Sequence, residues 1–345
     1  MRQQNADNSR HPVAAGAEPG TELMTASTKN TALHWASVHE FGFVAGMKLL
    51  FWLYKKIGRR PFRLILYPVL FWYLLFRPSA RHASQIYLRH VNRRQAIRTD
   101  LVKVIAHFAA FAEMMLDKML LWSGSVDPAS ICTAGTELIE QLIAEKRGAV
   151  FICSHLGNAD FSRILSGNHR SQITILAHTK HARMFNQLLS AMNPLSQLNV
   201  VQVTEMTPDT AMMLATKVAD GEFIMIAGDR IPVAPEPRVV MAEFLGEPAP
   251  FPVGPYVLAS VLQCPLYMLF SAKIADRIVV QVELLRESVR LPRNNRDEQL
   301  VRLVADYARH LESHCLQSPL QWFNFYDYWQ LPAFDPASAD GRGNK

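Results

Sequence analysis

The chain has 345 residues, of which 49% are hydrophobic and 19% are charged, and its formal net charge is +6 at pH 7. This length suits one large domain or two small ones, and the composition is apolar for a freely soluble protein, so we expect part of the surface to meet lipid. The positive charge favours an anionic partner; nucleic acid is disfavoured, because the basic residues lie beside apolar runs and not in a recognised binding module.

The two ends of the chain are polar. Residues 1–30 carry acids and contain no apolar core of a signal peptide, so we expect a disordered N-terminus. Residues 334–345 are expected to form a flexible tail.

Residues 31–95 contain two apolar runs, Phe41–Tyr54 and Leu64–Phe76, each shorter than the ~20 residues that a spanning helix needs. From Lys55 to Lys103 there are twelve Lys or Arg residues and a single acid. We interpret this segment as basic, membrane-associating helices that dip into one leaflet. A buried helical hairpin is the alternative, and whether the runs cross the bilayer stays open.

Residues 96–333 are predicted to form one α/β domain, because apolar runs of strand length alternate with helical patterns. The fold class is a mixed, mainly parallel sheet flanked by helices, with a hairpin near residue 276. The expected strands are 149–154, 172–178, 199–203, 222–227, 238–244, 265–274 and 277–285. The expected helices are 96–122, 136–146, 158–166, 181–192, 208–220, 254–263 and 296–316.

His155 is the first candidate catalytic residue. The strand 149–154 ends beside it, Gly157 and Asn158 follow as turn residues, and a helix is expected to begin near Asp160. Active sites gather at this edge of open α/β sheets. An imidazole there can take a proton from an attacking hydroxyl, and a nearby carboxylate can orient the ring. A histidine with an acid five residues later is common by chance, so the position at a strand end carries the argument.

Gly228-Asp229-Arg230 closes a second buried strand, at the same sheet edge if the strands are parallel. Arg230 could bind a phosphate with its forked guanidinium. The alternative is a surface ion pair between Asp229 and Arg230.

Residues 244–255 contain four prolines and are expected to form a loop that enters a helix at Gly254. The first amides of that helix would be available for an anion, although a plain loop is equally compatible. The aromatic stretch 321–329 could line an acyl channel, but packing in the core is the simpler interpretation.

Several motifs are absent from the sequence. It contains no Gly-x-Ser-x-Gly elbow, no P-loop, no Gly-x-Gly-x-x-Gly after a strand and no Cys/His cluster suited to zinc. The four scattered cysteines are expected to be reduced. We therefore expect no metal and no cofactor, and a direct mechanism without a covalent enzyme intermediate.

The segment His155-Leu-Gly-Asn-Ala-Asp160 resembles the His-x4-Asp/Glu motif of the lysophospholipid acyltransferase superfamily. The order of the remaining pieces, from the basic apolar N-terminal segment to the aromatic stretch, resembles the bacterial lipid A biosynthesis (lauroyl/myristoyl) acyltransferase branch over roughly residues 35–330. Three details differ from that branch and indicate a divergent member. Gly-Asp-Arg-Ile-Pro at 228–232 replaces the acidic-Gln pattern that we expect in a lipid A enzyme. Asp160 replaces its usual Glu, and Val253 stands where the superfamily has the Glu of Phe-Pro-Glu-Gly.

This resemblance implies a glycerol-3-phosphate acyltransferase-like fold. It also implies transfer of a fatty acyl chain from an acyl carrier protein or coenzyme A thioester to a hydroxyl or amine of a lipid or glycolipid. The expected location is the cytoplasmic face of the bacterial inner membrane, peripheral or with a single anchor. By resemblance His155 is the general base and Asp160 its partner, and the residues expected to bind substrate are Arg230, Asp229, Asn158, Arg163, Phe251 and Gly254.

Two other functions stay open at this point. A non-catalytic lipid-binding or assembly protein would bind lipid regardless of changes at His155, and a thioesterase would release free fatty acid with water as the acceptor. The acceptor, the chain length, the donor carrier and the oligomeric state are not predicted.

Overall fold

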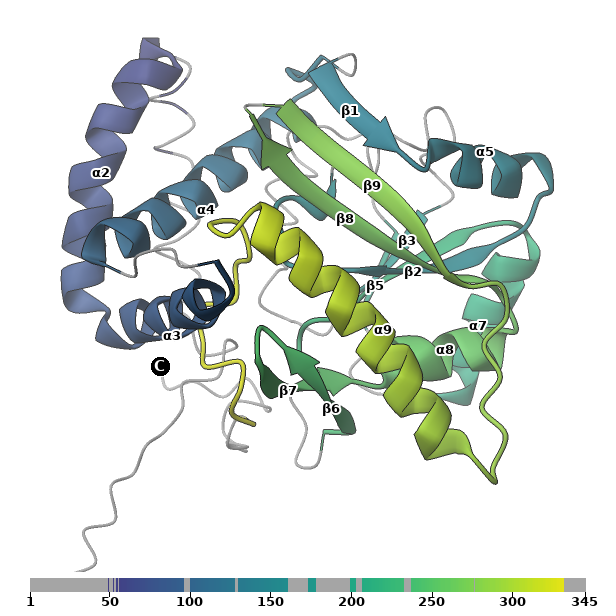
Figure 1. The fold of residues 1–345 in the computed structure, drawn as a ribbon. Helices are drawn as coiled ribbons and strands as arrows, with labels where there is room; N and C mark the ends of the chain where they lie inside the picture. The colour runs from purple at the N-terminus through teal and green to yellow at the C-terminus, as the bar shows by residue number, and fades with distance from the viewer. Residues whose placement is uncertain are drawn as a thin grey trace, which may run out of the picture. The chain divides into compact units, whose positions relative to one another are not determined.

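The computed structural model describes residues 49, 52, 54, 56–95, 100–127, 130–160, 173–177, 199–202, 207–232, 237–275 and 277–331. The predicted helices 158–166 and 181–192 lie outside these residues, apart from 158–160, and so do both terminal segments. Figure 1 shows the arrangement of the labelled helices and strands.

The centre of the described chain is a seven-stranded mixed sheet in the order β1-β9-β8-β2-β5-β3-β4. Strands β8, β2, β5, β3 and β4 are mutually parallel, and β9 turns back antiparallel to β8 with β1 parallel to it. This confirms the predicted fold class. The bounds are β1 Ile131–Ala134, β2 Ala149–Cys153, β3 Ile173–Ala177, β4 Asn199–Gln202, β5 Phe223–Ala227, β8 Leu266–Ile274 and β9 Arg277–Arg286.

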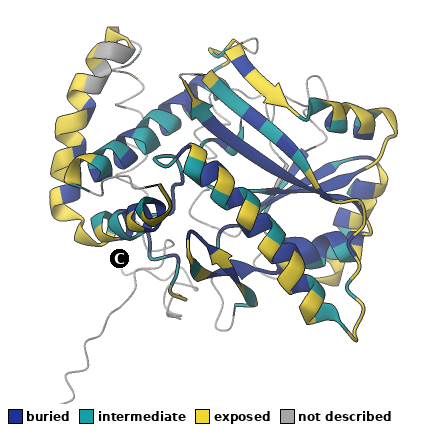
Figure 2. Ribbon diagram, viewed as in Figure 1, coloured by how far each residue is buried: buried dark blue, intermediate teal, exposed yellow. Residues whose placement is uncertain are grey.

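Helices cover both faces of the sheet, as the alternation of side chains along β2 requires. Val150 and Ile152 point into the larger core, which is shared with α8 (Gly254–Leu262) and α9 (Arg296–Gln317). Phe151 points into a second core, closed by α5 (Thr136–Ala144). The central strands β2, β5 and β8 are mostly buried between these helices, whereas the edge strand β1 is mostly exposed, as its yellow colour in Figure 2 shows. Helix α7 (Pro208–Ala219) begins at the cap Thr207 and contacts β5 and α8.

The proline-rich stretch forms a hairpin of β6 (Val239–Phe244) and β7 (Glu247–Pro252), apart from the main sheet. Our prediction of a loop at 244–255 was therefore wrong. Leu245 and Gly246 both have positive φ, as a two-residue hairpin turn requires. The prolines of β7 are at 248, 250 and 252. In an antiparallel pair only every second residue exchanges hydrogen bonds with the residue opposite it, and these prolines occupy the positions that do not, so no hydrogen bond is lost.

Among the described residues before the sheet are helices α2 (Arg59–Phe76), α3 (Pro78–Gln95) and α4 (Leu101–Trp122). Helix α4 begins at residue 101, where the Asp100 carboxylate accepts a hydrogen bond from the Lys103 amide. All three helices contribute side chains to the larger core, so residues 59–95 pack with the α/β region. No helix in the described ranges has both the length and the apolarity to cross a bilayer.

Helix α2 buries one stripe and exposes the rest. Leu66, Leu70 and Leu74 recur every fourth residue and are buried in the larger core. Most of the other apolar side chains of the helix are exposed, including Trp72 at 64% and Phe76 at 61%. Soluble proteins rarely expose so continuous an apolar surface, which is typical of a site that contacts a partner or a membrane.

Part of the basic stretch is neutralised within the fold. Arg93 pairs with Glu247, and the Arg94 Nε lies 3.2 Å from a Glu312 oxygen. These two arginines form ion pairs that connect α3 to the β6–β7 hairpin and to α9. They therefore have a structural role besides any binding of anionic lipid.

Candidate active site

Strands β2 and β5 end side by side at the carboxyl edge of the sheet. Cys153 lies opposite Ala227, and the Gly228 amide donates to the Cys153 carbonyl at 2.8 Å. A Cβ on Gly228 would lie 2.3 Å from the Ile152 side chain, so only glycine fits this close approach. His155 and Asp229 each lie two residues beyond the end of their strand. Because Cys153 is paired with Ala227, the two residues come side by side at the sheet edge.

The imidazole of His155 is hydrogen-bonded to the carboxylate of Asp229. The Nδ1–Oδ1 distance is 2.8 Å, and the backbone N–H of His155 donates to Oδ2 at 2.7 Å. Asp229 is wholly buried, and the Trp322 Nε1–H donates to its Oδ2 at 2.9 Å. Because a buried carboxylate is costly unless its oxygens receive hydrogen bonds, these donors are what make this position tenable.

The electrostatics select one tautomer of His155. Burial alone would raise the pKa of Asp229, but the charge and hydrogen bonds of His155, with the Trp322 bond, outweigh it and lower that pKa. The ionised carboxylate can only accept, so the His155 Nδ1 carries the proton and Nε2 keeps its lone pair. Burial and the nearby Arg230 charge lower the pKa of His155, against the opposing effect of Asp229. The ring is therefore neutral near pH 7 and able to accept a proton.

Asp160 does not hold the ring in the way that we predicted. Its Oδ2 accepts from the Trp122 Nε1–H at 2.9 Å and lies 3.0 Å from the Lys118 Nζ. The carboxylate that binds Nδ1 comes from the neighbouring strand instead, because parallel pairing aligns His155 with Asp229.

The aromatic stretch 321–329 forms a wall behind this pair. The Phe323 amide donates to the His155 carbonyl at 2.9 Å, and the Gly157 amide donates to the Gln321 carbonyl at 2.8 Å. Trp322 between them is wholly buried in the core, as the simpler interpretation held. Its hydrogen bond to Asp229 was not predicted, although a buried indole N–H usually requires an acceptor.

A cavity of about 340 Å³ opens in front of His155. Its charged lining comprises Lys118 and Arg230 on the basic side and Asp160 on the acidic side, so the described lining has an excess of positive charge. Apolar side chains such as Phe111, Met225 and Ile231 complete the walls. Within the described ranges, no set of His, Cys, Asp and Glu side chains is placed to hold a metal ion.

The other predicted binding residues are distributed unevenly. Asn158, Arg230 and Gly254 line the cavity, and the Arg230 Nε donates to the Asn324 Oδ1 at 3.1 Å. Asp229, which was expected to bind substrate, is wholly buried, does not line this cavity and instead holds the His155 ring. Phe251, which was also expected to bind substrate, does not line this cavity, and its ring is wholly buried against Phe244, Tyr307 and Tyr328.

Arg163, the remaining predicted substrate-binding residue, lies outside the described residues. The expected helix start at Gly254 is present, and Val253 before it makes no side-chain cap. Gly254 and Pro255 both line the cavity, so the electropositive end of α8 is at this site.

A family model described as bacterial lipid A biosynthesis acyltransferase matches residues 83–330. The chain belongs to this family. The match confirms the resemblance that the order of motifs indicated, and it makes the protein an acyltransferase. No curated protein matches the chain in sequence.

The matched part of this acyltransferase contains both members of the His155–Asp229 pair. It also contains every described residue of the cavity named above, together with most of α3 and all of α4, α9 and the aromatic wall. The site geometry and the family match thus refer to the same region.

We predict that Trp322→Phe lowers the free energy of unfolding, because Asp229 loses a buried donor. A hydrogen bond to a charged group contributes about 1.5–3 kcal/mol. The bond helps to lower the pKa of Asp229, so its contribution is present above the ordinary value of 3.8 and is lost as the pH falls below it. Denaturant unfolding at several pH values measures this effect.

The control for this prediction is Trp72→Phe, since that indole is exposed. A Trp322→Phe variant as stable as the wild type at pH 7 would contradict the assigned role of the indole. So would a destabilisation that does not shrink below pH 3.8.

Proposed function

We propose that the enzyme transfers a fatty acyl chain directly from a thioester to a lipid acceptor, with His155 as the general base. The Nε2 lone pair takes the proton from the acceptor hydroxyl or amine, and the acceptor oxygen or nitrogen bonds to the thioester carbonyl carbon. The carbon–sulfur bond then breaks, and the imidazolium returns its proton to the leaving thiolate. The observation that carries this proposal is the buried Asp229 carboxylate, which leaves the neutral ring with an unprotonated Nε2 beside the cavity.

Two features of the cavity support stabilisation of the negative oxygen that forms during attack. The Arg230 guanidinium lines the cavity, and the uncapped first turn of α8 presents its electropositive end there. Asn324 accepts from the Arg230 Nε, and the Phe323 carbonyl accepts from its Nη2 at 3.3 Å. These contacts would hold the guanidinium in place before the substrate arrives.

The substrates that we propose follow from the family description and from the charge of the site. The acceptor is a lipid A-like glycolipid, and the donor is an acyl carrier protein or coenzyme A thioester. Both types of donor carry phosphate, which suits a lining with an excess of positive charge. The apolar part of the lining would accept the start of the acyl chain.

We further propose that the enzyme is peripheral to the membrane, on its cytoplasmic face. The exposed side chains of α2 include Leu64, Trp72 and Phe76, and its buried stripe attaches the helix to the enzyme. A helix that is apolar on its outer side and anchored on its inner side would present the cavity to lipid substrates without crossing the bilayer.

We predict that His155→Ala lowers the rate of acyl transfer by about 10²–10⁴-fold while the protein stays folded, because the Nε2 lone pair that takes the acceptor proton is lost. Asp229→Asn should lower the rate by about 10²–10⁴-fold, since the ring loses its orienting carboxylate. Asp160→Asn should have a smaller effect, of about tenfold or less, because Asp160 acts through Lys118 and not through Nδ1. The assay follows labelled acyl donor into the lipid product.

His310→Ala is the matched control, because this histidine lies on α9 and pairs with Glu283, away from the cavity. Undiminished transfer by His155→Ala would remove the proposed base. A larger loss of rate in Asp160→Asn than in Asp229→Asn would contradict the assignment of the orienting role to Asp229.

The membrane proposal predicts that Trp72→Glu weakens binding to vesicles of phosphatidylethanolamine and phosphatidylglycerol by tenfold or more. Burying a large apolar side chain contributes about 1.5–3 kcal/mol, and about 1.4 kcal/mol corresponds to a factor of ten. Vesicle flotation measures the bound fraction. Val301→Glu, on the exposed side of α9, is the control and should bind as the wild type does. Equal binding by both variants would exclude α2 as the contact surface.

A further inference from the structure

A second cavity of about 240 Å³ adjoins the catalytic cavity. The two share Met114, Gly157 and Asn158 in their linings, so a single turn of chain after His155 separates them. The second cavity is far larger than the ~10–15 Å³ that one water molecule requires. It can therefore admit a group of several atoms that belongs to a molecule already bound in front of His155.

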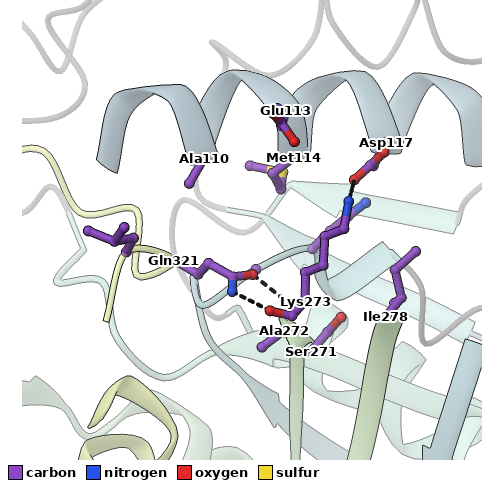
Figure 3. A pocket seen from close by; sticks show the side chains of 12 residues that line it. Ala110, Glu113, Met114, Asp117, Ser271, Ala272, Lys273, Ile278 and Gln321 are labelled. Carbon is purple, nitrogen blue, oxygen red and sulfur yellow. Dashed lines mark hydrogen bonds and ion pairs between the residues drawn. The ribbon is translucent and has the colours of Figure 1, made fainter. Parts of the chain in front are cut away.

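The charge of the second cavity is opposite to that of the first. Figure 3 shows Glu113 and Asp117 on α4 above Lys273 of β8, and the Lys273 Nζ lies 3.7 Å from an Asp117 oxygen. The described lining therefore has two carboxylates and one ammonium group. An anionic group such as a phosphate would be repelled here, whereas a hydroxyl or an ammonium group would find acceptors.

The walls of this cavity are fixed before any ligand arrives. The Gln321 side chain accepts from the Lys273 amide and donates to the Lys273 carbonyl, each at 2.7 Å (Figure 3). Gly157 has φ +58°, and a Cβ there would lie 2.0 Å from the Ser271 carbonyl oxygen. Close packing of the turn against β8 thus sets the width of the cavity.

Asn158 supplies an independent observation that points to ligand binding. It lines both cavities and is 95% buried, and its Oδ1 accepts from the Asp160 amide at 3.1 Å. Its Nδ2 has no hydrogen-bond partner among the described residues. Buried donors are nearly always paired, so a donor left unpaired between two cavities suits an oxygen brought by a substrate.

We propose that the second cavity binds a hydroxyl- or amine-bearing part of the acceptor headgroup and so positions the acceptor against His155. This inference rests on the proposed acyl transfer. The Glu113 and Asp117 carboxylates accept hydrogen bonds from the headgroup, and the Asn158 Nδ2 donates to one of its oxygens. Phosphate groups of either substrate stay on the side of Lys118 and Arg230.

The test is the effect of Glu113→Gln on transfer to under-acylated lipid A, with the acceptor concentration varied. Removing one negative charge should raise the KM for the acceptor at least fivefold, with a smaller change in kcat. If the cavity held a phosphate instead, the same substitution would lower that KM. Glu298→Gln is the matched control, since Glu298 lies on α9 and pairs with Arg302, and it should leave both parameters unchanged.

The outcomes separate this inference from the proposed function. A wild-type enzyme that transfers no acyl chain to under-acylated lipid A overturns the proposed acceptor and this inference together. This inference alone is overturned if the wild-type enzyme transfers the acyl chain but the Glu113→Gln variant has an unchanged or lowered KM for the acceptor. The same rise in acceptor KM in Asp117→Asn would support binding of the acceptor headgroup in the second cavity. A fall in kcat in both variants, with no change in the acceptor KM, would overturn it.

Discussion

The geometry of the site depends on the buried carboxylate of Asp229. Asp229 has no exposed surface, and an ion in such a place is stable only if its oxygens are occupied by donors. Four donors reach its oxygens: the His155 amide, the His155 ring, the Trp322 indole and, at 3.4 Å, the Asn324 side-chain amide. These donors depend on long-range features of the fold: the register of β2 with β5 places His155, and the return of the chain after α9 places Trp322 and Asn324.

This arrangement supports the proposed role of His155 as a base. Burial lowers the pKa of His155, which keeps the ring unprotonated, while Asp229 opposes that shift and keeps the ring basic enough to accept a proton. The same hydrogen bond selects the tautomer and aligns the ring. Protonation state, orientation and basicity thus have one structural cause.

The two cavities differ in charge in a way that could orient the substrates. One lining has an excess of positive charge and the other an excess of negative charge, and the turn at Gly157 and Asn158 lies between them. A substrate with phosphates at one end and hydroxyls or amines at the other would be oriented by this difference. The apolar face of α2 is suited to holding the same cavities near the lipid surface from which such a substrate comes.

Features that depend on local sequence were predictable. The strand 149–154, the position of His155 at its end, and helices such as 208–220 follow from apolar periodicity and turn residues that lie close together in the chain. The structure moves these ends by one or two residues.

The partner of His155 was not predictable in the same way. Strands β2 and β5 are neighbours in the sheet but are separated in the chain by β3 and β4, and sequence alone does not define that order. Asp160 was chosen because it is near in sequence, whereas Asp229 is near in space. The hairpin of β6 and β7 was not predictable for another reason: its prolines favour a loop, and only the pairing with β6 shows that their positions need no N–H.

The most direct test of the account is the protonation of the His155 ring itself, measured by the ring nitrogen chemical shifts of selectively labelled protein at pH 7. We expect a protonated Nδ1 hydrogen-bonded to Asp229 and an unprotonated Nε2, with a ring pKa below 6.5. A proton on Nε2 at pH 7, or a ring that is doubly protonated there, would contradict the claim that this pair forms the catalytic base.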